Sequence, residues 1–423
     1  MTVQELISTP SCGCDRADVS KGLWPVSDAL KQILSLIEPI KETEFIGLAN
    51  ASGRILATDI CATEDAPRFD TAAVDGYAVS MDQFQGSGPW NLTVDGRIAA
   101  GDPVGDGRPK AVAVQIFTGA KVPEGLDAVI MQEVVNRSGS RVIISNRPKP
   151  GLNIRKAGEE YTVGRTLLSS GAVLGPIEIA CTAAVGVGRL EVRRRLRISV
   201  VVSGNELRSA GDVLEGSDIW DVNTPMMQSV FDDPNLDVTD NVRVSDDRKC
   251  LAKALRCLAQ STDIVVVSGG ASVGEEDHLH SAIKDAGGAV SVSGVAIKPG
   301  KPVTFGTIGK TLLVGLPGNP VSAFVTWMAL GRPVLDHLAG KTNQSVPAHH
   351  VRTGHPLRHN LGRCEYRPAR ITGYDGSGIE VIEADQATHS GRITSLLGAD
   401  GLVRIPSFVE QVEPGDLLEF IPF

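Results

Sequence analysis

An alternation of β-branched strands and amphipathic helices between residues 197 and 330 limits the fold of this chain more than any other feature. The runs "RISVVVS", "DIVVVS" and "TLLVGL" are typical of buried strands, and "DDRKCLAKALRCLAQ" places Leu251, Leu255 and Leu258 on one helical face. Strands that alternate with helices form a doubly wound, largely parallel sheet, whose ligands bind beyond the carboxyl ends of the strands. We therefore predict an α/β domain over residues 196–340 with its binding site at that edge.

The segments on either side of this domain have different patterns. Residues 59–148 contain short strands separated by Gly, Pro and Asp turns, which predicts a β-rich insert domain. Helical patterns flank this insert, so residues 26–58 and 149–195 are expected to form one discontinuous linker domain. The tail, residues 345–423, is again β-like and predicts a small β-barrel. The expected fold is thus a multidomain α/β protein with four domains.

Charge and hydropathy narrow the classes of protein. The 423 residues carry a formal net charge of −9, which would repel a polyanion, so we expect no nucleic-acid partner. No apolar stretch has the length that crosses a bilayer, and the first residues lack a basic region followed by an apolar core. We expect a cytoplasmic protein without membrane contact. The densest basic run, Arg193, Arg194, Arg195 and Arg197, is interpreted as a solvated face or an interdomain hinge.

A glycine-rich loop, "SGGASVGEED" at residues 268–277, directly follows one predicted strand. Glycines let backbone amides turn inward, hydroxyls add donors, and the next helix offers its N-terminus to an anion. The loop is therefore a candidate phosphate cradle, although a tight turn with a polar cap is the structural alternative. Its candidate ligand-binding residues are Ser268, Gly269, Gly270, Ser272 and Gly274.

A second loop, "LPGNPVSAF" at residues 316–324, follows another predicted strand. Pro317 and Gly318 bend the chain, Asn319 can cap the next helix, and a proline at the first helical position suits a helix start. Taken alone, this is an ordinary connection between a strand and a helix. Ser322 lies in the first turn of that helix and adds a hydroxyl.

The third loop, "KPGKP" at residues 298–302, holds two like charges close together. Proline fixes φ and removes a backbone donor, so the loop is stiff and cannot join the middle of a sheet. Lys298 and Lys301 are therefore presented to solvent or to a ligand. Because two exposed amide-rich loops are expected beside them, a bound anion explains the pair better than solvation does.

Carboxylates accompany these cationic features. Asp277 closes the glycine-rich loop, and Asp246 and Asp247 precede a helix where a strand ends. Carboxylates that lie close together repel unless a cation separates them, and oxygen ligands suit Mg²⁺ that also contacts phosphate. We predict that Asp277 and Asp246 hold the metal, with a helix cap as the alternative role for Asp246 or Asp247.

Seven blocks of sequence, taken in their order along the chain, resemble the molybdopterin molybdenumtransferases of the MoeA type. That family is similar to the E domain of gephyrin. The resemblance runs from about Val26 to Phe423. The blocks are "PRFDTAAVDGYAV" (67–79), "FTGAKVPEGLDAVIMQE" (117–133), "NIRKAGEEYTVGRTLLSSG" (153–171), "VVSGNEL" (201–207), "SGGASVGEED" (268–277), "KPGKP" (298–302) and "LPGNPVSA" (316–323).

The resemblance implies a chemistry. Family enzymes take adenylyl-molybdopterin and molybdate, cleave the adenylyl group with Mg²⁺, and insert molybdenum into the pterin dithiolene, releasing AMP. Positive charge and a metal would stabilise the developing phosphate oxygens. The resemblance also implies a homodimer, with an upstream molybdopterin adenylyltransferase and recipient molybdoenzymes as further partners.

The resemblance assigns roles to individual residues. Asp277 matches the carboxylate needed for adenylyl cleavage. The insert domain carries two matches that would face the pocket of the other subunit in a dimer. The matches to molybdate-site positions are Lys298, Lys301, Pro302, Ser322, Ser395 and Arg367, and those to further active-cleft positions are Glu206, Asp75 and Thr118.

One departure from the family pattern concerns the metal. Where the family usually has TGDEL, this chain has Ser203 to Leu207 as SGNEL, so Asn205 replaces a carboxylate. An amide supplies no negative charge to a metal, whereas Glu206 remains available. A non-catalytic scaffold of the gephyrin type is the alternative function, and an adenylyltransferase is a third. Retention of the charged set at Asp277, Lys298, Lys301 and Glu206 favours the enzyme.

Overall fold

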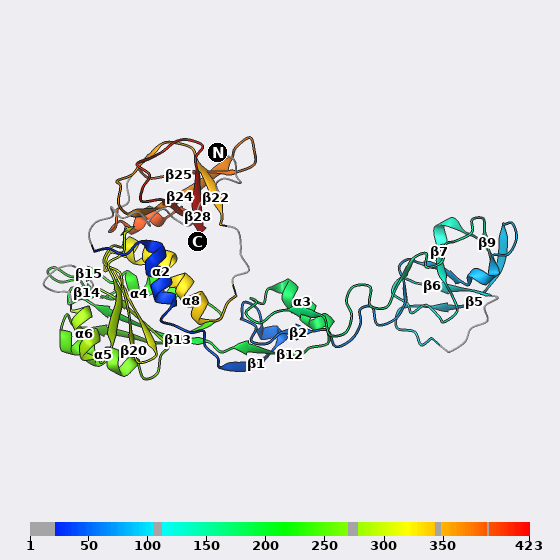
Figure 1. Cartoon of the computed structure of the whole chain (residues 1–423), viewed down its shortest axis with the longest axis horizontal. Helices are drawn as coiled ribbons and strands as arrows, with labels where there is room; N and C mark the ends of the chain where they lie inside the picture. The colour runs from blue at the N-terminus through cyan, green and yellow to red at the C-terminus, as the bar shows by residue number, and fades with distance from the viewer. Residues whose placement is uncertain (1–21, 105–111, 270–277, 343–347, 387–388) are drawn as a thin grey trace. The chain divides into compact units, whose positions relative to one another are not determined.

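The computed structural model describes residues 22–104, 112–269, 278–342, 348–386 and 389–423. The chain divides into two compact units (Figure 1). The first contains residues up to 57, residues 171–175 and residues 190–423. The second contains residues 58–170 and 176–189. Within the described ranges, none of the helices combines the length and apolar content that crossing a membrane requires.

The first unit contains the predicted α/β sheet. Its four strands from β16 to β21 run parallel, and β20 and β18 continue the sheet antiparallel. The prediction of a largely parallel sheet is confirmed. In spatial order the strands are β16 (Leu236–Val244), β13 (Leu196–Ser203), β17 (Ile264–Ser268), β21 (Thr311–Leu316), β20 (Thr304–Ile308) and β18 (Ala289–Ser293).

Helices cover both faces of this sheet, as the strand composition requires. Alternate residues of a strand point to opposite faces, and the buried side chains accordingly fall into two cores. Val266 packs in a core with α2, α4, α7 and α8, whereas Val265 and Val267 pack with α5 and α6. The helices are α2 (Val26–Leu34), α4 (Asn223–Val230), α5 (Arg248–Leu258), α6 (Leu279–Asp285), α7 (Pro320–Thr326) and α8 (Arg332–Leu338), with the π-helix η5 (Trp327–Gly331) between the last two.

The C-terminal part of the first unit is a closed five-stranded barrel. Pairing of β24 with β26 closes the ring that runs through β25, β22 and β28, so the predicted barrel is confirmed. A two-residue strand from the α/β domain, β19 (Ile297–Lys298), adds to β24 in parallel. The barrel strands are β22 (His350–Thr353), β24 (Cys364–Tyr374), β25 (Glu380–Ala384), β26 (Gly401–Ile405) and β28 (Leu417–Pro422).

This pairing corrects one expectation for the "KPGKP" loop, in which both lysines were predicted to be presented to solvent or to a ligand. Lys298 opposes Glu365 across the β19–β24 pair, and its side chain is only 25% exposed. The strand lies at the edge of the sheet, where a following proline is tolerated. Lys301 is exposed, as expected.

The second unit is β-rich. Its six-stranded sheet has the order β7-β4-β6-β5-β9-β8. The strands are β4 (Gly76–Val79), β5 (Trp90–Ile98), β6 (Val112–Ile116), β7 (Ala128–Met131), β8 (Asn136–Ser138) and β9 (Arg141–Ile144). The unit also contains α3 (Pro176–Ala184), β2 (Ile60–Cys61), β3 (Thr71–Ala72), β10 (Ile154–Arg155), β11 (Thr166–Leu168), η3 (Met81–Gln83) and η4 (Gln132–Val134).

Short elements complete the chain. They are β1 (Thr43–Gly47), η2 (Leu48–Asn50), β12 (Arg189–Arg193), β14 (Leu207–Arg208), β15 (Ile219–Trp220), β23 (Leu357–Arg358), η6 (Ile393–Leu396) and β27 (Gln411–Val412). Of these, β14 and β15 pair in parallel beside the α/β sheet.

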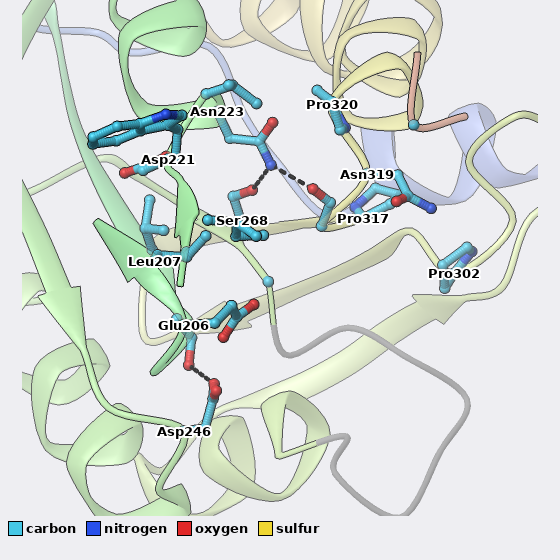
Figure 2. A pocket seen from close by; sticks show the side chains of 18 residues that line it. Glu206, Leu207, Asp221, Asn223, Asp246, Ser268, Pro302, Pro317, Asn319 and Pro320 are labelled. Atoms are coloured by element: carbon cyan, nitrogen blue, oxygen red, sulfur yellow. Dashed lines mark hydrogen bonds between the residues drawn. The ribbon is translucent and has the colours of Figure 1, made fainter. Parts of the chain in front are cut away.

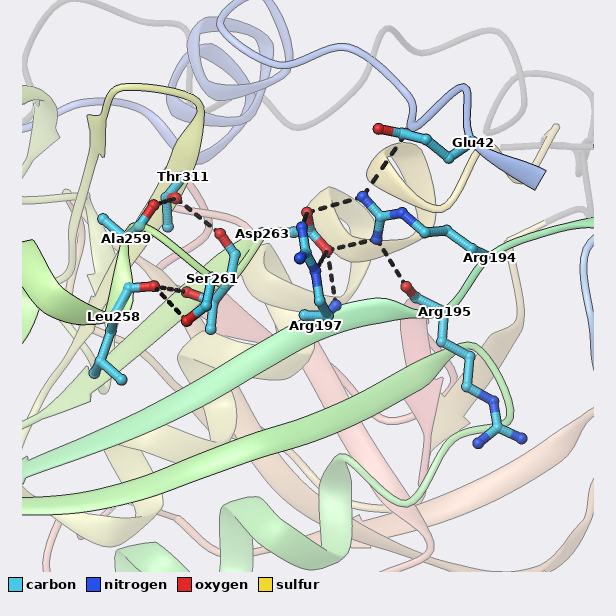
Figure 3. A network of polar contacts seen from close by, with 10 residues as sticks. Glu42, Arg194, Arg195, Arg197, Leu258, Ala259, Ser261, Asp263 and Thr311 are labelled. Carbon is cyan, nitrogen blue, oxygen red and sulfur yellow. Dashed lines mark hydrogen bonds and ion pairs between the residues drawn. The ribbon is translucent and has the colours of Figure 1, made fainter. Parts of the chain in front are cut away.

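The arginine run is partly bound rather than solvated. Arg194 lies 2.7 Å from Asp263 and Arg197 lies 3.1 Å from it, at the amino end of β17 (Figure 3). The Asp263 side chain is 15% exposed. Burial would raise the pKa of Asp263, but the hydrogen bonds from Arg194 and Arg197 outweigh it and lower the pKa from 3.8 to about 2. Arg195 is exposed as predicted, whereas Arg194 is bound rather than solvated, and the alternative interpretation as an interdomain hinge stays a prediction.

Candidate active site at the carboxyl ends of the strands

A cavity of about 780 Å³ lies where β13, β17 and β21 end (Figure 2). This is the edge at which the fold predicts a binding site. Eight of the predicted site residues line it, namely Glu206, Asp246, Ser268, Gly269, Pro302, Pro317, Gly318 and Asn319. The remaining lining residues are Val202, Ser203, Leu207, Ile219, Trp220, Asp221, Val222, Asn223, Pro320 and Gly391.

Two carboxylates, Asp246 and Glu206, lie on one side of this cavity (Figure 2). The Ser203 hydroxyl donates to Asp246 at 2.6 Å, and the backbone N–H of Asn205 donates to its other carboxylate oxygen at 3.0 Å. These bonds fix Asp246 while leaving its negative charge without a cation among the described residues. Glu206 also has no ion-pair partner in the part of the chain that the structure describes.

The neighbouring Asp247 takes the capping role that the sequence left open. Its carboxylate accepts from the backbone N–H of Cys250 at 2.8 Å and caps α5. This bond lowers the pKa of Asp247. The two adjacent carboxylates therefore divide their tasks, because Asp247 serves the helix and Asp246 lines the cavity.

Asn205, the departure from the family pattern, holds the same loop. Its side-chain oxygen accepts from the backbone N–H of Asp246 at 3.3 Å, while its own N–H donates to the Asp246 carboxylate. A carboxylate at this position would add a third negative charge beside Asp246 and Glu206. The amide accepts the same hydrogen bond without that repulsion.

Asn223 joins two of the predicted loops and was missed from the sequence. Its side-chain nitrogen donates to the Ser268 hydroxyl at 2.8 Å and to the Gly318 carbonyl at 2.7 Å (Figure 2). Asp221 accepts two hydrogen bonds from Thr224 and thereby holds the start of α4. No local pattern in the sequence distinguishes a bridging Asn from a capping one.

The glycine-rich loop is described at its beginning. Ser268 is 1% exposed, and Gly269 has a φ of +89°, which favours glycine. A Cβ atom on Gly269 would lie 2.2 Å from the Ser203 carbonyl oxygen, so only glycine lets β13 and β17 end this close together. The other predicted residues of the loop, Gly270, Ser272, Gly274 and Asp277, lie outside the described residues.

The second loop begins its helix where predicted. Pro320 is the first residue of α7 and Asn319 occupies the cap position, but the Asn319 side chain makes no capping bond. It donates instead to the Ser390 hydroxyl at 3.3 Å. Ser322 is 4% exposed in the first turn and does not line the cavity.

Two of the expected molybdate-site residues contact a buried carboxylate. Lys298 and Arg367 each lie 2.8 Å from Glu365, whose side chain is fully buried. Burial would raise the pKa of Glu365, but hydrogen bonds from Arg367 and Lys298 lower it below its usual value. Ser395 lies on η6 and donates to the Arg392 carbonyl at 2.8 Å. Of the molybdate-site set, Pro302 alone lines the 780 Å³ cavity as far as the structure describes the chain.

Comparison with known proteins identifies the family. Three family models match in order, the MoeA N-terminal region (domain I and II) over residues 24–186, a "Probable molybdopterin binding domain" over 199–337 and the MoeA C-terminal region (domain IV) over 350–423. A molybdopterin molybdenumtransferase of Haemophilus influenzae is 38% identical over 310 residues, 73% of this chain and 76% of that protein. The chain belongs to the MoeA family of molybdopterin molybdenumtransferases.

Two further comparisons extend over most of the chain. A molybdopterin molybdenumtransferase of Nostoc sp. is 31% identical over 391 residues, 90% of this chain and 89% of that protein. The crystal structure of the molybdopterin biosynthesis MoeA protein of Pyrococcus horikoshii OT3 matches with a TM-score of 0.80 and 29% identity, covering 95% of this chain and 100% of that one. The resemblance stated from the sequence blocks is confirmed, and the family is one of transferases in molybdenum cofactor biosynthesis.

In the second unit, the two residues that resemble MoeA cleft positions form a pair of their own. The backbone N–H and the hydroxyl of Thr118 donate to one oxygen of Asp75 at 2.8 and 2.7 Å. The backbone bond, followed by the hydroxyl bond, lowers the pKa of Asp75. The pair is preorganised within its unit, and its role in the cleft stays a prediction.

The donor set at the cavity is compatible with the Mg²⁺ that the MoeA resemblance implies. Asp246 and Glu206 offer hard oxygen ligands without a competing cation, which suits Mg²⁺ with retained waters. No group of three His, Cys, Asp or Glu side chains is assembled for a metal within the described ranges. The predicted partner of Asp246, Asp277, lies outside them.

Proposed function

We propose that this chain is a molybdenum insertase, which uses adenylyl-molybdopterin and molybdate with Mg²⁺ to form the molybdenum cofactor and releases AMP. The observation that carries the proposal is the cavity of about 780 Å³ with Asp246 and Glu206 on its wall. Its size lies within the range of small-molecule sites, about 300–1,000 Å³. Family membership supports the chemistry, because the relatives it matches are molybdopterin molybdenumtransferases.

The walls of the cavity suit the two ends of such a substrate. Ser268 and Gly269 stand where phosphate groups would meet the glycine-rich loop. Leu207, Ile219 and Trp220 form an apolar wall, and Trp220 is 40% exposed. A flat pterin or adenine ring gains by stacking on such an aromatic side chain.

The aspartates, Asn223 and the two lysines have distinct tasks in the proposed reaction. Asp246, with Asp277, would hold Mg²⁺, which supplies charge stabilisation to the phosphate oxygens when bound. Asn223 keeps the Ser268 and Gly318 loops in fixed relation, so the substrate phosphates meet preformed donors. Lys298 and Lys301 would bind molybdate, a dianion that needs charged donors.

The direct test measures AMP release and active cofactor when the protein is incubated with adenylyl-molybdopterin, Mg²⁺ and molybdate. We expect both products to depend on the metal and on molybdate, and Asp277→Ala to abolish them. A scaffold of the gephyrin type would bind the pterin without releasing AMP. AMP release that is indifferent to Asp277, metal and molybdate would exclude the proposed mechanism.

We further propose that the protein works in the cytoplasm as a homodimer, in which Asp75 and Thr118 of one subunit serve the cleft of the other. The preorganised Asp75–Thr118 pair supports this role, since its hydrogen bonds hold a carboxylate in place within the second unit itself. An upstream molybdopterin adenylyltransferase and recipient molybdoenzymes are the expected partners. Sedimentation equilibrium checks the dimer.

A further inference from the structure

Glu365 is a buried carboxylate that none of the proposed steps uses. Its two oxygens are divided between two cations, because Oε1 lies 2.8 Å from Lys298 Nζ and Oε2 lies 2.8 Å from Arg367 Nη2. His359 lies 3.9 Å from the same carboxylate. The Glu365 and Arg367 side chains are 0% and 1% exposed, whereas Lys298 is 25% exposed. Of the three, Lys298 is therefore the one that an anion in solvent can reach.

Strand geometry explains why these groups meet. Glu365 and Arg367 are two residues apart on β24, so their side chains leave the same face of the strand. The parallel pairing of β19 with β24 puts Lys298 opposite Glu365. The backbone register thus delivers a lysine of the α/β domain to a carboxylate of the barrel.

Arg367 is closed off from solvent by its other contacts. Its Nη1 donates to the Asp385 carbonyl at 3.1 Å, and its Nη2 donates to the Arg358 carbonyl as well as to Glu365. Its Nε has no hydrogen-bond partner in the described chain, but the side chain is only 1% exposed, so an oxyanion in solvent does not reach it. The resemblance matches Arg367 to a molybdate-site position, and this burial favours an indirect role for it there.

We propose that Glu365 is a positioning residue that aims Lys298 at the oxyanion, and that Arg367 acts through Glu365 rather than by touching the anion. This inference rests on the proposed function, in which Lys298 binds molybdate. Lysine has a flexible stem that loses considerable freedom when it is fixed. A buried counter-ion that fixes Lys298 before the anion arrives reduces that loss at the moment of binding.

A double-mutant cycle on molybdate affinity, measured by equilibrium dialysis of the full chain, tests the proposal. We expect Lys298→Met to weaken binding about tenfold or more, the scale of a charge-assisted hydrogen bond. Glu365→Gln should weaken it about tenfold, and the double variant should bind no more weakly than Lys298→Met alone. Arg367→Gln should show the same absence of added loss in the Lys298→Met background.

The outcomes separate the two levels of the argument. If Lys298→Met leaves molybdate affinity unchanged, the oxyanion assignment of the proposed function fails, and this inference with it. If Lys298→Met weakens binding but Glu365→Gln does not, or if their losses add fully, only the positioning role is overturned. Full addition by Arg367→Gln would instead show that Arg367 contacts the anion directly.

A matched control lies in the same barrel. Glu419 forms an ion pair with Arg404 and makes no contact with Lys298, so Glu419→Gln should leave molybdate affinity unchanged. If Glu365→Gln does not fold, Glu365→Asp keeps the negative charge beside Arg367 but is one methylene too short to hold both cations. It is expected to give the same loss and the same non-additivity with Lys298→Met, and wild-type affinity in this variant would contradict the proposal.

Discussion

The carboxylates at the two ends of strand β17 differ in whether they form ion pairs. At its amino end, Asp263 is bound by Arg194 and Arg197, and its pKa falls to about 2 (Figure 3). Beyond its carboxyl end, Asp246 and Glu206 line a cavity and have no cation partner among the described residues. One strand therefore separates a carboxylate that two arginines neutralise from two carboxylates without an ion-pair partner, although the cavity also has Asp221, which pairs with Arg243 at 3.7 Å.

Buried side-chain amides without a hydrogen-bond partner do not distinguish the two ends of the sheet, because each end has one. The side-chain oxygens of Asn223 near the cavity and of Asn235 at the start of β16 are both buried without a hydrogen-bond partner in the described chain. The two ends differ instead in ion pairing, because Asp263 is paired with two arginines, whereas Asp246 and Glu206 have no ion-pair partner in the described chain.

The largest expected effect comes from removing the unpaired charge. Asp246→Asn should lower the rate of AMP release by about a hundredfold, because a group that stabilises the reacting phosphate and its metal is lost. Asp247→Asn is the matched control one residue away, since Asn also caps helices well. Equal rates of AMP release for Asp246→Asn and wild type would contradict a functional role for the unpaired carboxylate at the carboxyl end.

At the amino end, the expected effect is on stability. Asp263→Asn should lower the free energy of unfolding by about 3 kcal/mol, because Arg194 and Arg197 lose the carboxylate that neutralises them. The measurement is urea unfolding at pH 7, and the folded variant should keep the wild-type rate of AMP release. A loss of activity without a loss of stability would place Asp263 in the functional region instead.

The same ion pair predicts a pH dependence with a definite sign. The folded pKa of Asp263 lies below its ordinary value of 3.8, at about 2. Its contribution, about 2 kcal/mol, is therefore fully present above pH 3.8 and is lost as the pH falls toward 2. The stability difference between wild type and Asp263→Asn should shrink when unfolding is measured at pH 5, 4 and 3, and a constant difference would contradict the pairing.

The smallest expected effects come from substituting Asn223 and Asn235. Asn223→Ala should weaken binding of AMP about tenfold, since two hydrogen bonds between the Ser268 and Gly318 loops are lost. Asn235→Ala removes a similar bond to the Gly53 carbonyl and should lower stability by about 1 kcal/mol without affecting AMP binding. Isothermal titration calorimetry with AMP checks both variants, and equal weakening would show that Asn223 has no special role.

Local patterns in the sequence predicted the elements but not the pairings between them. The strand and helix periodicities gave the α/β sheet, and the position of the loops after strands predicted the edge that carries the cavity. Arg194 and Asp263, by contrast, are 69 residues apart, and their ion pair depends on which strands become neighbours. The contacts of Asn223 and Lys298 could not be predicted for the same reason. Their partners are set by strand order and register rather than by adjacent residues.

The pairing of β19 with β24 also sets an order of assembly. The α/β domain precedes the barrel in the chain, yet Lys298 finds its counter-ion only on a strand that begins at Cys364. Domains fold from the N-terminus as a chain is synthesised. The α/β domain therefore leaves the ribosome before Glu365 is available. The Lys298–Glu365 ion pair can form only after β24 has been synthesised. Synthesis that stops before β24 would leave Lys298 without Glu365, its ion-pair partner.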